Sequence, residues 1–199
     1  MTHRLAEASD LAAALLRRVL PDEEHASLAG ESLSRTPDRM VKALADLLDG
    51  YGADIPAMLT SFPSERPSDG AHEQPIVIVR GIGFASLCEH HVLPFTGAAS
   101  VAYVPRDRIV GLSKIPRVVR AYSRRLQVQE RLTNQIADAL APLDPIGVMV
   151  VVRGRHTCCA IRGAESDVEM VTSAVRGCFR SDASARAEAL MLLGEHGGR

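Results

Sequence analysis

The fold class is decided by the middle of the chain, residues 111–140, with the sequence GLSKIPRVVRAYSRRLQVQERLTNQIADAL. Apolar side chains recur there at helical spacing, which predicts one long amphipathic helix from about Pro116 to Ala141. Its apolar face is formed by Val118, Val119, Tyr122, Leu126, Leu132, Ile136 and Leu140. Because strands flank this helix rather than alternate with several helices, the pattern favours an α+β fold over a doubly wound one.

The flanking segments are short, β-rich and bounded by Gly and Pro, which predicts antiparallel hairpins. They are PIVIVRGIGF (75–84), GAASVAYVP (97–105) and RIVGLS (108–113) before the helix, and IGVMVVVRG (146–154) and VEMVTSAVRG (168–177) after it. A last helix is predicted in SDASARAEALMLLGE (181–195).

Two helices are expected before the strands. Apolar residues from Ala8 to Val19 recur at helical spacing, and Pro21 ends that helix. The second helix opens with Thr36 as N-cap and Pro37 at the first helical position. We therefore expect a helical extension in residues 1–59, a surface loop rich in Pro, Ser and Gly in 60–75, and the sheet domain in 76–199.

The composition is that of a globular chain of 199 residues, with 46% hydrophobic and 24% charged residues. The formal net charge of −1 gives no overall field that favours nucleic acid or an acidic membrane. No apolar run approaches the roughly 20 residues that a membrane helix needs. The N-terminal apolar stretch is interrupted by Glu7 and Asp10 and has no signal-peptide cleavage site, so we expect a cytoplasmic protein.

The four cysteines are Cys88, Cys158, Cys159 and Cys178. Their uneven placement in a chain of this length argues against a disulfide framework and favours metal or catalytic use. Cys178 is interpreted as structural. For Cys159, strand alternation predicts a place in the core, although a loop would exchange its position with that of Cys158.

A metal site is predicted from two distant motifs, CEHH (88–91) and HTCC (156–159). Cys88, His91 and Cys158 would supply three ligands to zinc and leave a fourth position for water. On an extended segment, His156 would share a face with Cys158. His90 and His156 would remain as proton carriers. The alternative, buried structural cysteines and a turn histidine, is less favoured because the two motifs occur together in one short chain.

Charged residues near the long helix suggest a site for an anionic ligand. Lys114 and Arg117 stand at its start, and a helix N-terminus with two cations is a natural anion site. Arg162 follows the second cysteine motif, and Arg39 lies in the first turn of the second helix. Mid-helix Glu130 either solvates the helix or accepts hydrogen bonds from a ligand.

Several of these segments closely resemble GTP cyclohydrolase I. They are CEHH, residues 111–140, HTCCAIRG (156–163) and TSAVRGCFRSDASAR (172–186), with RTPDRMVKAL (35–44) upstream. The resemblance covers roughly Leu33 to Leu190. It implies a zinc enzyme that converts GTP and water to 7,8-dihydroneopterin triphosphate and formate, the first step towards folate and pterin cofactors.

The resemblance also implies a role for each matching residue. Cys88, His91 and Cys158 would bind zinc, while Cys159 takes a position that is usually apolar. His156 and His90 would transfer protons, and Ser113 would lie near the ribose. Glu130 would hold the guanine edge with Gln129 beside it. The triphosphate would be bound by Lys114, Arg117 and Arg162, with Arg39 reaching it from a neighbouring subunit.

The implied architecture is a T-fold, an antiparallel sheet with helices packed on one side. Its sheets join across subunits into a barrel, usually in a homodecamer with active sites between subunits. The extension would then serve as an assembly element and triphosphate arm, and 76–199 as the catalytic domain. One departure lies at Val168 and Met170, where the family usually has a Ser-x-Thr and one residue more. A divergent relative that acts on another purine nucleotide or stops at the ring-opened formamide is one alternative, and a non-catalytic nucleotide-binding protein is another.

Overall fold

The chain divides into two compact units, Met1–Asp49 and Gly50–Arg199. The computed structural model describes residues 3–21, 33–64 and 75–194. In the first unit, α1 (His3–Val19) packs against α2 (Thr36–Leu47), and both helices confirm the sequence prediction. The N-cap of α2 is Arg35 rather than Thr36. Within the described ranges, no helix is long and apolar enough to cross a membrane.

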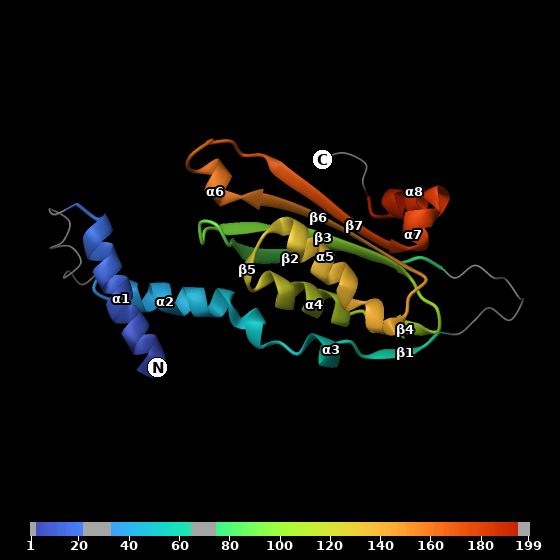
Figure 1. Ribbon diagram of the computed structural model, residues 1–199, viewed down its shortest axis with the longest axis horizontal. Coiled ribbons are helices and arrows are strands. Elements are labelled where there is room, and N and C mark those ends of the chain that lie inside the picture. The colour runs from blue at the N-terminus through green and yellow to red at the C-terminus, as the bar shows by residue number, and fades with distance from the viewer. Residues whose placement is uncertain (1–2, 22–32, 65–74, 195–199) are drawn as a thin grey trace, which may run out of the picture. The chain divides into compact units, whose positions relative to one another are not determined.

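The second unit is built on a curled five-stranded sheet with the strand order β5-β2-β3-β6-β7 (Figure 1). Neighbouring strands are antiparallel, except that β5 runs parallel to β2. The strands are β2 (Val77–Cys88), β3 (Pro94–Val104), β5 (Leu126–Gln127), β6 (Gly147–His156) and β7 (Glu169–Gly177). The long strands confirm the β-rich segments, and the fold is α+β as predicted.

A smaller sheet pairs β1 (Ser61–Pro63) with β4 (Arg108–Val110) in antiparallel register. The 3-10 helix η3 (Asp49–Gly52) and the short helix α3 (Ile55–Met58) come before it in the chain. β1 lies in the stretch 60–75, where the sequence predicts only a loop. Residues 65–74 of that stretch lie outside the described residues.

The prediction of one long helix in the middle of the chain is wrong. The structure has two helices there, α4 (Lys114–Ser123) and α5 (Gln129–Ala139), which are separated by β5. The 3-10 helix η4 (Ala141–Leu143) follows α5. The apolar periodicity is therefore real in each half, but the halves belong to different helices.

Tertiary contacts cause this break. Leu126 and Gln127 form a ladder with the end of β2, which requires an extended backbone. The guanidinium of Arg125 donates to the carbonyl oxygen of Ala121 (3.2 Å) in the last turn of α4, and to that of Gly50 (3.0 Å). A carbonyl that accepts from a side chain does not need the next helical N–H, so α4 can end here.

Helices cover both faces of the main sheet (Figure 1). α4 and α5 cover one face, where Val150 and Ile136 are buried. α7 (Cys178–Ser181) and α8 (Ala183–Leu192) pack on the other face, where Met149 and Phe179 are buried. The expectation of helices on one side only is therefore wrong. Successive residues of β6 are apolar and point to opposite faces, so each face needs a cover.

Candidate active site

Four segments meet at one end of the main sheet. β2 ends at Cys88 and β6 ends at His156, which is paired with Phe95 at the start of β3. β5 pairs Gln127 with Cys88 and leads directly into α5, whose first residue is Gln129. The register of the sheet therefore gathers both sequence motifs and the N-terminus of α5 at this end.

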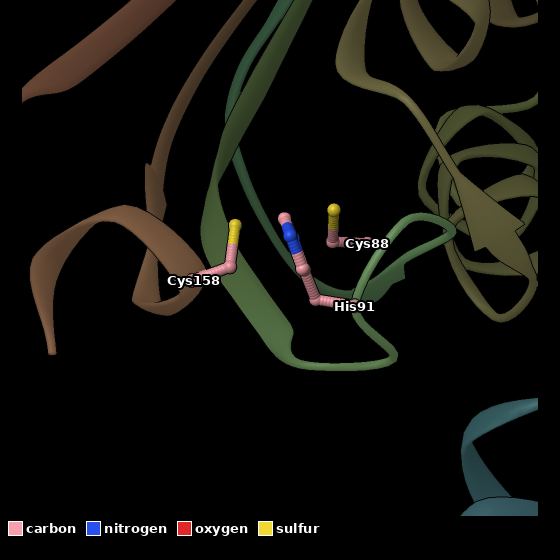
Figure 2. A group of neighbouring side chains, drawn as sticks. All are labelled: Cys88, His91 and Cys158. Atoms are coloured by element: carbon pink, nitrogen blue, oxygen red, sulfur yellow. The ribbon is translucent and has the colours of Figure 1, made fainter. Parts of the chain in front are cut away.

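The side chains of Cys88, His91 and Cys158 point to a common space (Figure 2). Their ligand atoms all lie within 4.8 Å of one another. Cys88 is buried, whereas His91 is exposed and belongs to the turn after β2. That turn is closed by Val92, whose N–H donates to the Cys88 carbonyl (2.8 Å) with a left-handed φ of 54°. These three residues form a group that could hold a metal ion.

Cys158 reaches this group from a helical turn. It lies in α6 (Thr157–Ala160), so the expected extended segment that aligns it with His156 is not present. The Thr157 hydroxyl donates to the carbonyl of Pro94 (2.6 Å) and thereby fixes the start of α6 against β3. Cys159 is half-buried beside the site and is not among the three clustered ligand atoms.

The chemistry of this donor set fits a soft or borderline metal ion. Burial and the neighbouring Cys88 sulfur raise the pKa of the Cys158 thiol. A bound cation would stabilise the thiolate form of Cys158 against this shift. Two sulfurs and one imidazole nitrogen are also the ligand types that zinc takes in proteins.

His90 lies beside this group without joining it. Its Nδ1 is 3.9 Å from the Cys88 sulfur, and its ring meets that of His91 edge to face, with centroids 6.3 Å apart. The preceding residue, Glu89, forms an ion pair with Arg131 of α5. The turn after β2 therefore presents His91 to the ligand group and His90 to the adjoining space.

His156 is held on two sides. Its ring lies flat on that of Phe95, with centroids 4.4 Å apart and planes 7° from parallel. Its Nε2 is 3.1 Å from Oε1 of Gln129. Burial lowers the pKa of His156, and the charge of Glu130 opposes this shift. The ring is therefore fixed in place and favoured in its neutral form at neutral pH.

A cavity of about 270 Å³ connects these residues. It is lined by Cys88, His90, His91, Gln127, Val128, Gln129, Glu130, His156, Cys158, Cys159 and Met170. Seven of the site residues predicted from the sequence therefore line this cavity. They are Cys88, His91, Cys158, His90, His156, Gln129 and Glu130. Glu130 is exposed, and its carboxylate is the acidic group among these lining residues.

The residues predicted to bind the triphosphate and ribose do not line this cavity. Ser113 and Lys114 begin α4, which follows β4. Val110 of β4 donates its N–H to the hydroxyl of Tyr103 (3.0 Å), near the far end of β3. The N-terminus of α4 therefore lies at the opposite end of the sheet from Cys88, and Arg117 is one turn further along α4.

The remaining predicted cations are placed differently. Arg162 is exposed just after α6, close in sequence to Cys158 but outside the cavity lining. Arg39 lies on α2 in the N-terminal unit, where it lines a separate cavity of about 560 Å³ together with Arg35 and Lys42.

The departure at Val168 and Met170 lies at the start of β7. Val168 is 54% exposed, whereas Met170 lines the cavity and its carbonyl accepts from Gln129 Nε2 (2.9 Å). This contact uses the backbone, so a different side chain at position 170 leaves it available. Ion pairs from β6 hold the segment: Arg155 with Asp167 (2.7 Å) and Arg153 with Glu169 (3.1 Å).

Sequence reasoning missed Phe95 and Thr172, which support the site from within the sheet. Phe95 is fully buried and stacks on His156, and the Thr172 hydroxyl lies 3.2 Å from Gln129 Nε2. Each contact depends on the strand register, and a single sequence gives no signal for it.

Comparison with known proteins identifies the family of the chain. The family model described as GTP cyclohydrolase I matches residues 13–194. "GTP cyclohydrolase 1" of Leptospira biflexa is 47% identical over 82% of this chain and 87% of its own length. The protein of the same name from Deinococcus radiodurans is 49% identical over 79% of this chain and 72% of its own, and that from Chlorobaculum tepidum 44% identical over 96% and 82%. The chain belongs to the GTP cyclohydrolase I family.

Proposed function

We propose that this chain converts GTP and water to 7,8-dihydroneopterin triphosphate and formate, as the first step of tetrahydrofolate and pterin biosynthesis. The observation that carries the proposal is one cavity shared by a Cys–His–Cys group, two further histidines and a glutamate, in a chain of the GTP cyclohydrolase I family. Opening a purine imidazole ring by hydrolysis needs an activated water, a proton donor and a group that holds the base. The cavity supplies candidates for each.

Zinc is the metal that best suits Cys88, His91 and Cys158. A tetrahedral zinc ion holds sulfur at about 2.3 Å and nitrogen at about 2.0–2.1 Å, so its ligands lie roughly 3.5–4 Å apart. Ligand atoms already within 4.8 Å of one another reach these distances through small side-chain adjustments. When bound, zinc with three protein ligands polarises a water molecule at its fourth position and lowers the pKa of that water towards about 7.

His156 and His90 are the proton carriers in this proposal. The neutral ring of His156 can take up a proton from the attacking water and then, as imidazolium, give it to N7 of the purine as the ring opens. General acid–base catalysis of this kind contributes roughly 10²–10⁴-fold. His90, next to Cys88, can serve the second hydrolysis that releases C8 as formate. Ser113 would act later, near the ribose, where the sugar rearranges and closes onto the freed amine.

Glu130 is proposed to select guanine. Its exposed carboxylate at the N-terminus of α5 can accept hydrogen bonds from the ring N–H and the exocyclic amine of guanine. Adenine lacks this donor pair and would leave the carboxylate without partners, which is a strong basis for rejecting it. Gln129 would stand beside the base.

We propose that a second copy of the chain completes the site. The proposed triphosphate ligands Lys114 and Arg117 lie at the end of the sheet opposite to Cys88, too far along the same chain to meet a nucleotide held there. A neighbouring copy, in a homo-oligomer such as a decamer, can bring them to the cavity. Arg162 is proposed to contribute from the cavity's own chain and Arg39 from the neighbour's N-terminal extension.

The direct test is incubation of the zinc-loaded protein with GTP, followed by mass spectrometry, oxidation to a fluorescent pterin and a formate assay. Equal amounts of formate and dihydroneopterin triphosphate support the proposal. A gain of one water without formate indicates a relative that stops at the ring-opened formamide, and turnover of a different purine nucleotide indicates altered specificity. Bound GTP without any product would identify a non-catalytic nucleotide-binding protein and overturn the proposal.

A further inference from the structure

Gln129 is buried in a network that fixes the direction of its carboxamide. It is 1% exposed, and its Nε2 lies 3.1 Å from the Val152 carbonyl oxygen and 2.9 Å from that of Met170. Carbonyl oxygens only accept hydrogen bonds, so these two positions require the NH₂ end of the amide. The opposite end, Oε1, is therefore the one that faces His156.

Two threonines complete this network. Thr133 donates its hydroxyl hydrogen to the Gln129 backbone carbonyl (2.7 Å), and its oxygen lies 2.6 Å from that of Thr172. With this hydrogen used, Thr172 must be the donor to Thr133. The Thr172 oxygen is then free to accept from Gln129 Nε2 at 3.2 Å. Every donor in the network therefore has an acceptor, and only one assignment of donors and acceptors fits these contacts.

This direction determines where the proton lies on His156. Oε1 of Gln129 can only accept, so the His156 nitrogen at 3.1 Å, Nε2, must carry hydrogen. In the neutral imidazole the other nitrogen, Nδ1, is then the one without a proton. Because Phe95 holds the plane of the ring, Gln129 fixes both the rotation of the ring in that plane and its tautomer.

Gly154 provides the space that this arrangement needs. It lies on β6, two residues before His156, and a Cβ added there would overlap Oε1 of Gln129. The cheapest relief of that overlap is movement of the carboxamide end, which would break its contact with His156. The glycine thus offers a second way to disturb the same contact without changing Gln129.

We propose that Gln129 is a positioning residue for His156: its carboxamide, oriented by the carbonyls of Val152 and Met170, keeps the proton on Nε2 and leaves Nδ1 to exchange a proton with the substrate. The inference rests on the proposed role of His156. It assigns the Gln129 side chain to the orientation of His156 rather than to contact with the substrate. That amide makes its hydrogen bonds to protein groups, so its loss should affect turnover and leave GTP affinity nearly unchanged.

The kinetic test compares Gln129→Met, Gly154→Ala and the double variant, all zinc-loaded. Met has a similar volume and no amide. We expect each single variant to lower kcat by about 10–100-fold, with the KM for GTP within about 2-fold, since the interaction lost serves the chemical step. The double variant should be no worse than Gln129→Met alone, because both changes break one contact. Asp138→Asn, an exposed polar position more than two turns further along the same helix, is the control and should retain kcat.

Other kinetic outcomes overturn the proposal. A raised KM with unchanged kcat in Gln129→Met would make Gln129 a substrate contact. If the reductions in kcat of the two single variants multiply in the double variant, Gly154 and Gln129 act separately. Metal content and thermal unfolding are measured alongside, so that a variant that fails to fold is recognised and the conclusion is drawn from the spectroscopic test.

The spectroscopic test does not depend on GTP turnover. Solid-state ¹⁵N NMR of zinc-loaded, histidine-labelled protein reports which ring nitrogen carries the proton, with His156→Asn used to assign the signal. We expect the unmodified protein to show His156 protonated on Nε2. Protonation on Nδ1 there would overturn the inference even if the enzyme is active. If the enzyme does not convert GTP but the expected tautomer is found, the proposed function fails and the positioning by Gln129 stands.

Discussion

The ring of His156 lies flat against the ring of Phe95, with 4.4 Å between the centroids. Phe95 is fully buried and meets Phe84 edge to face at 5.7 Å, so the ring under the histidine is itself held by the core. The hydrophobic core thereby extends to the proposed proton carrier. Substitution of Phe95 should therefore change turnover as well as stability.

Phe95→Leu should lower kcat more than its effect on stability alone explains. Without the flat ring, His156 can tilt away from its position, and a misplaced catalytic group costs about 10-fold or more in rate. The matched control is Phe84→Leu, which removes a similar aromatic area from the same cluster, where no histidine ring is stacked. Both variants should lose on the order of 1–2 kcal/mol of unfolding free energy, measured in urea. Equal kcat values for the two variants would show that the stack has no role in turnover.

Adjacent cysteines provide a test of the metal ligands. Cys158→Ser should lose bound zinc, because a neutral hydroxyl replaces one of three ligands, whereas Cys159→Ser should retain it. Inductively coupled plasma mass spectrometry of the purified proteins measures the difference in zinc content. Zinc loss from Cys159→Ser and not from Cys158→Ser would reassign the ligand to the neighbouring position.

Mixed assemblies test whether a site is shared between copies. Cys158→Ser and Lys114→Ala should each abolish or strongly lower activity alone, since one lacks a proposed metal ligand and the other a proposed triphosphate ligand. If the two residues of one site come from different copies, random co-assembly restores about a quarter of the sites. Co-expression with two affinity tags isolates the mixed oligomers for assay. Mixed oligomers without activity would place both residues of a site on one chain.

The buried Tyr103 should make the protein lose stability at alkaline pH. Burial raises the pKa of Tyr103, although the hydrogen bond from Val110 N–H opposes the shift. The folded state therefore keeps the proton to higher pH than the unfolded state, whose tyrosine pKa is about 10. The contribution of protonated Tyr103 to the free energy of unfolding is complete below a pH of about 10, and it is lost as the pH rises through the folded-state pKa.

Tyr103→Phe should remove that part of the alkaline decline. At neutral pH it should lose about 1 kcal/mol, because Val110 N–H loses its acceptor. Urea unfolding from neutral to alkaline pH measures both effects. Burial also raises the pKa of Cys178, and this contribution remains in both proteins. An equally steep decline in the variant would show that Tyr103 does not cause it.

The strands and the terminal helices could be predicted from the sequence, because each buries a face whose period is visible in the residues themselves. The break between α4 and α5 could not. Both halves have helical periodicity, and β5 forms only because Leu126 and Gln127 pair with residues of β2. Arg125, whose guanidinium also lies over the rings of Tyr51 and Tyr122, holds the break from the side.

For the site, the sequence motifs named the ligand group, His90, His156, Gln129 and Glu130, but neither the other lining residues nor the contacts between them. Cys88 and His91 lie on one turn, so their spacing carries the information. The contact of Gln129 with His156 joins a helix to a strand end through the register of three strands, and no spacing encodes it. The position of Lys114 at the other end of the sheet likewise depends on the path of the chain through β3 and β4.

The ligand group also implies an order of events when the chain is made. Cys88 and His91 leave the ribosome first, and Cys158 follows only after α4, α5 and β6 have been synthesised. The three ligands come together only once β6 has joined β3, because that pairing places α6 beside the earlier turn. Metal uptake is therefore expected late in folding and should couple to it. A newly made chain that has not yet added β6 to its sheet can offer an ion only two ligands, and should let it go.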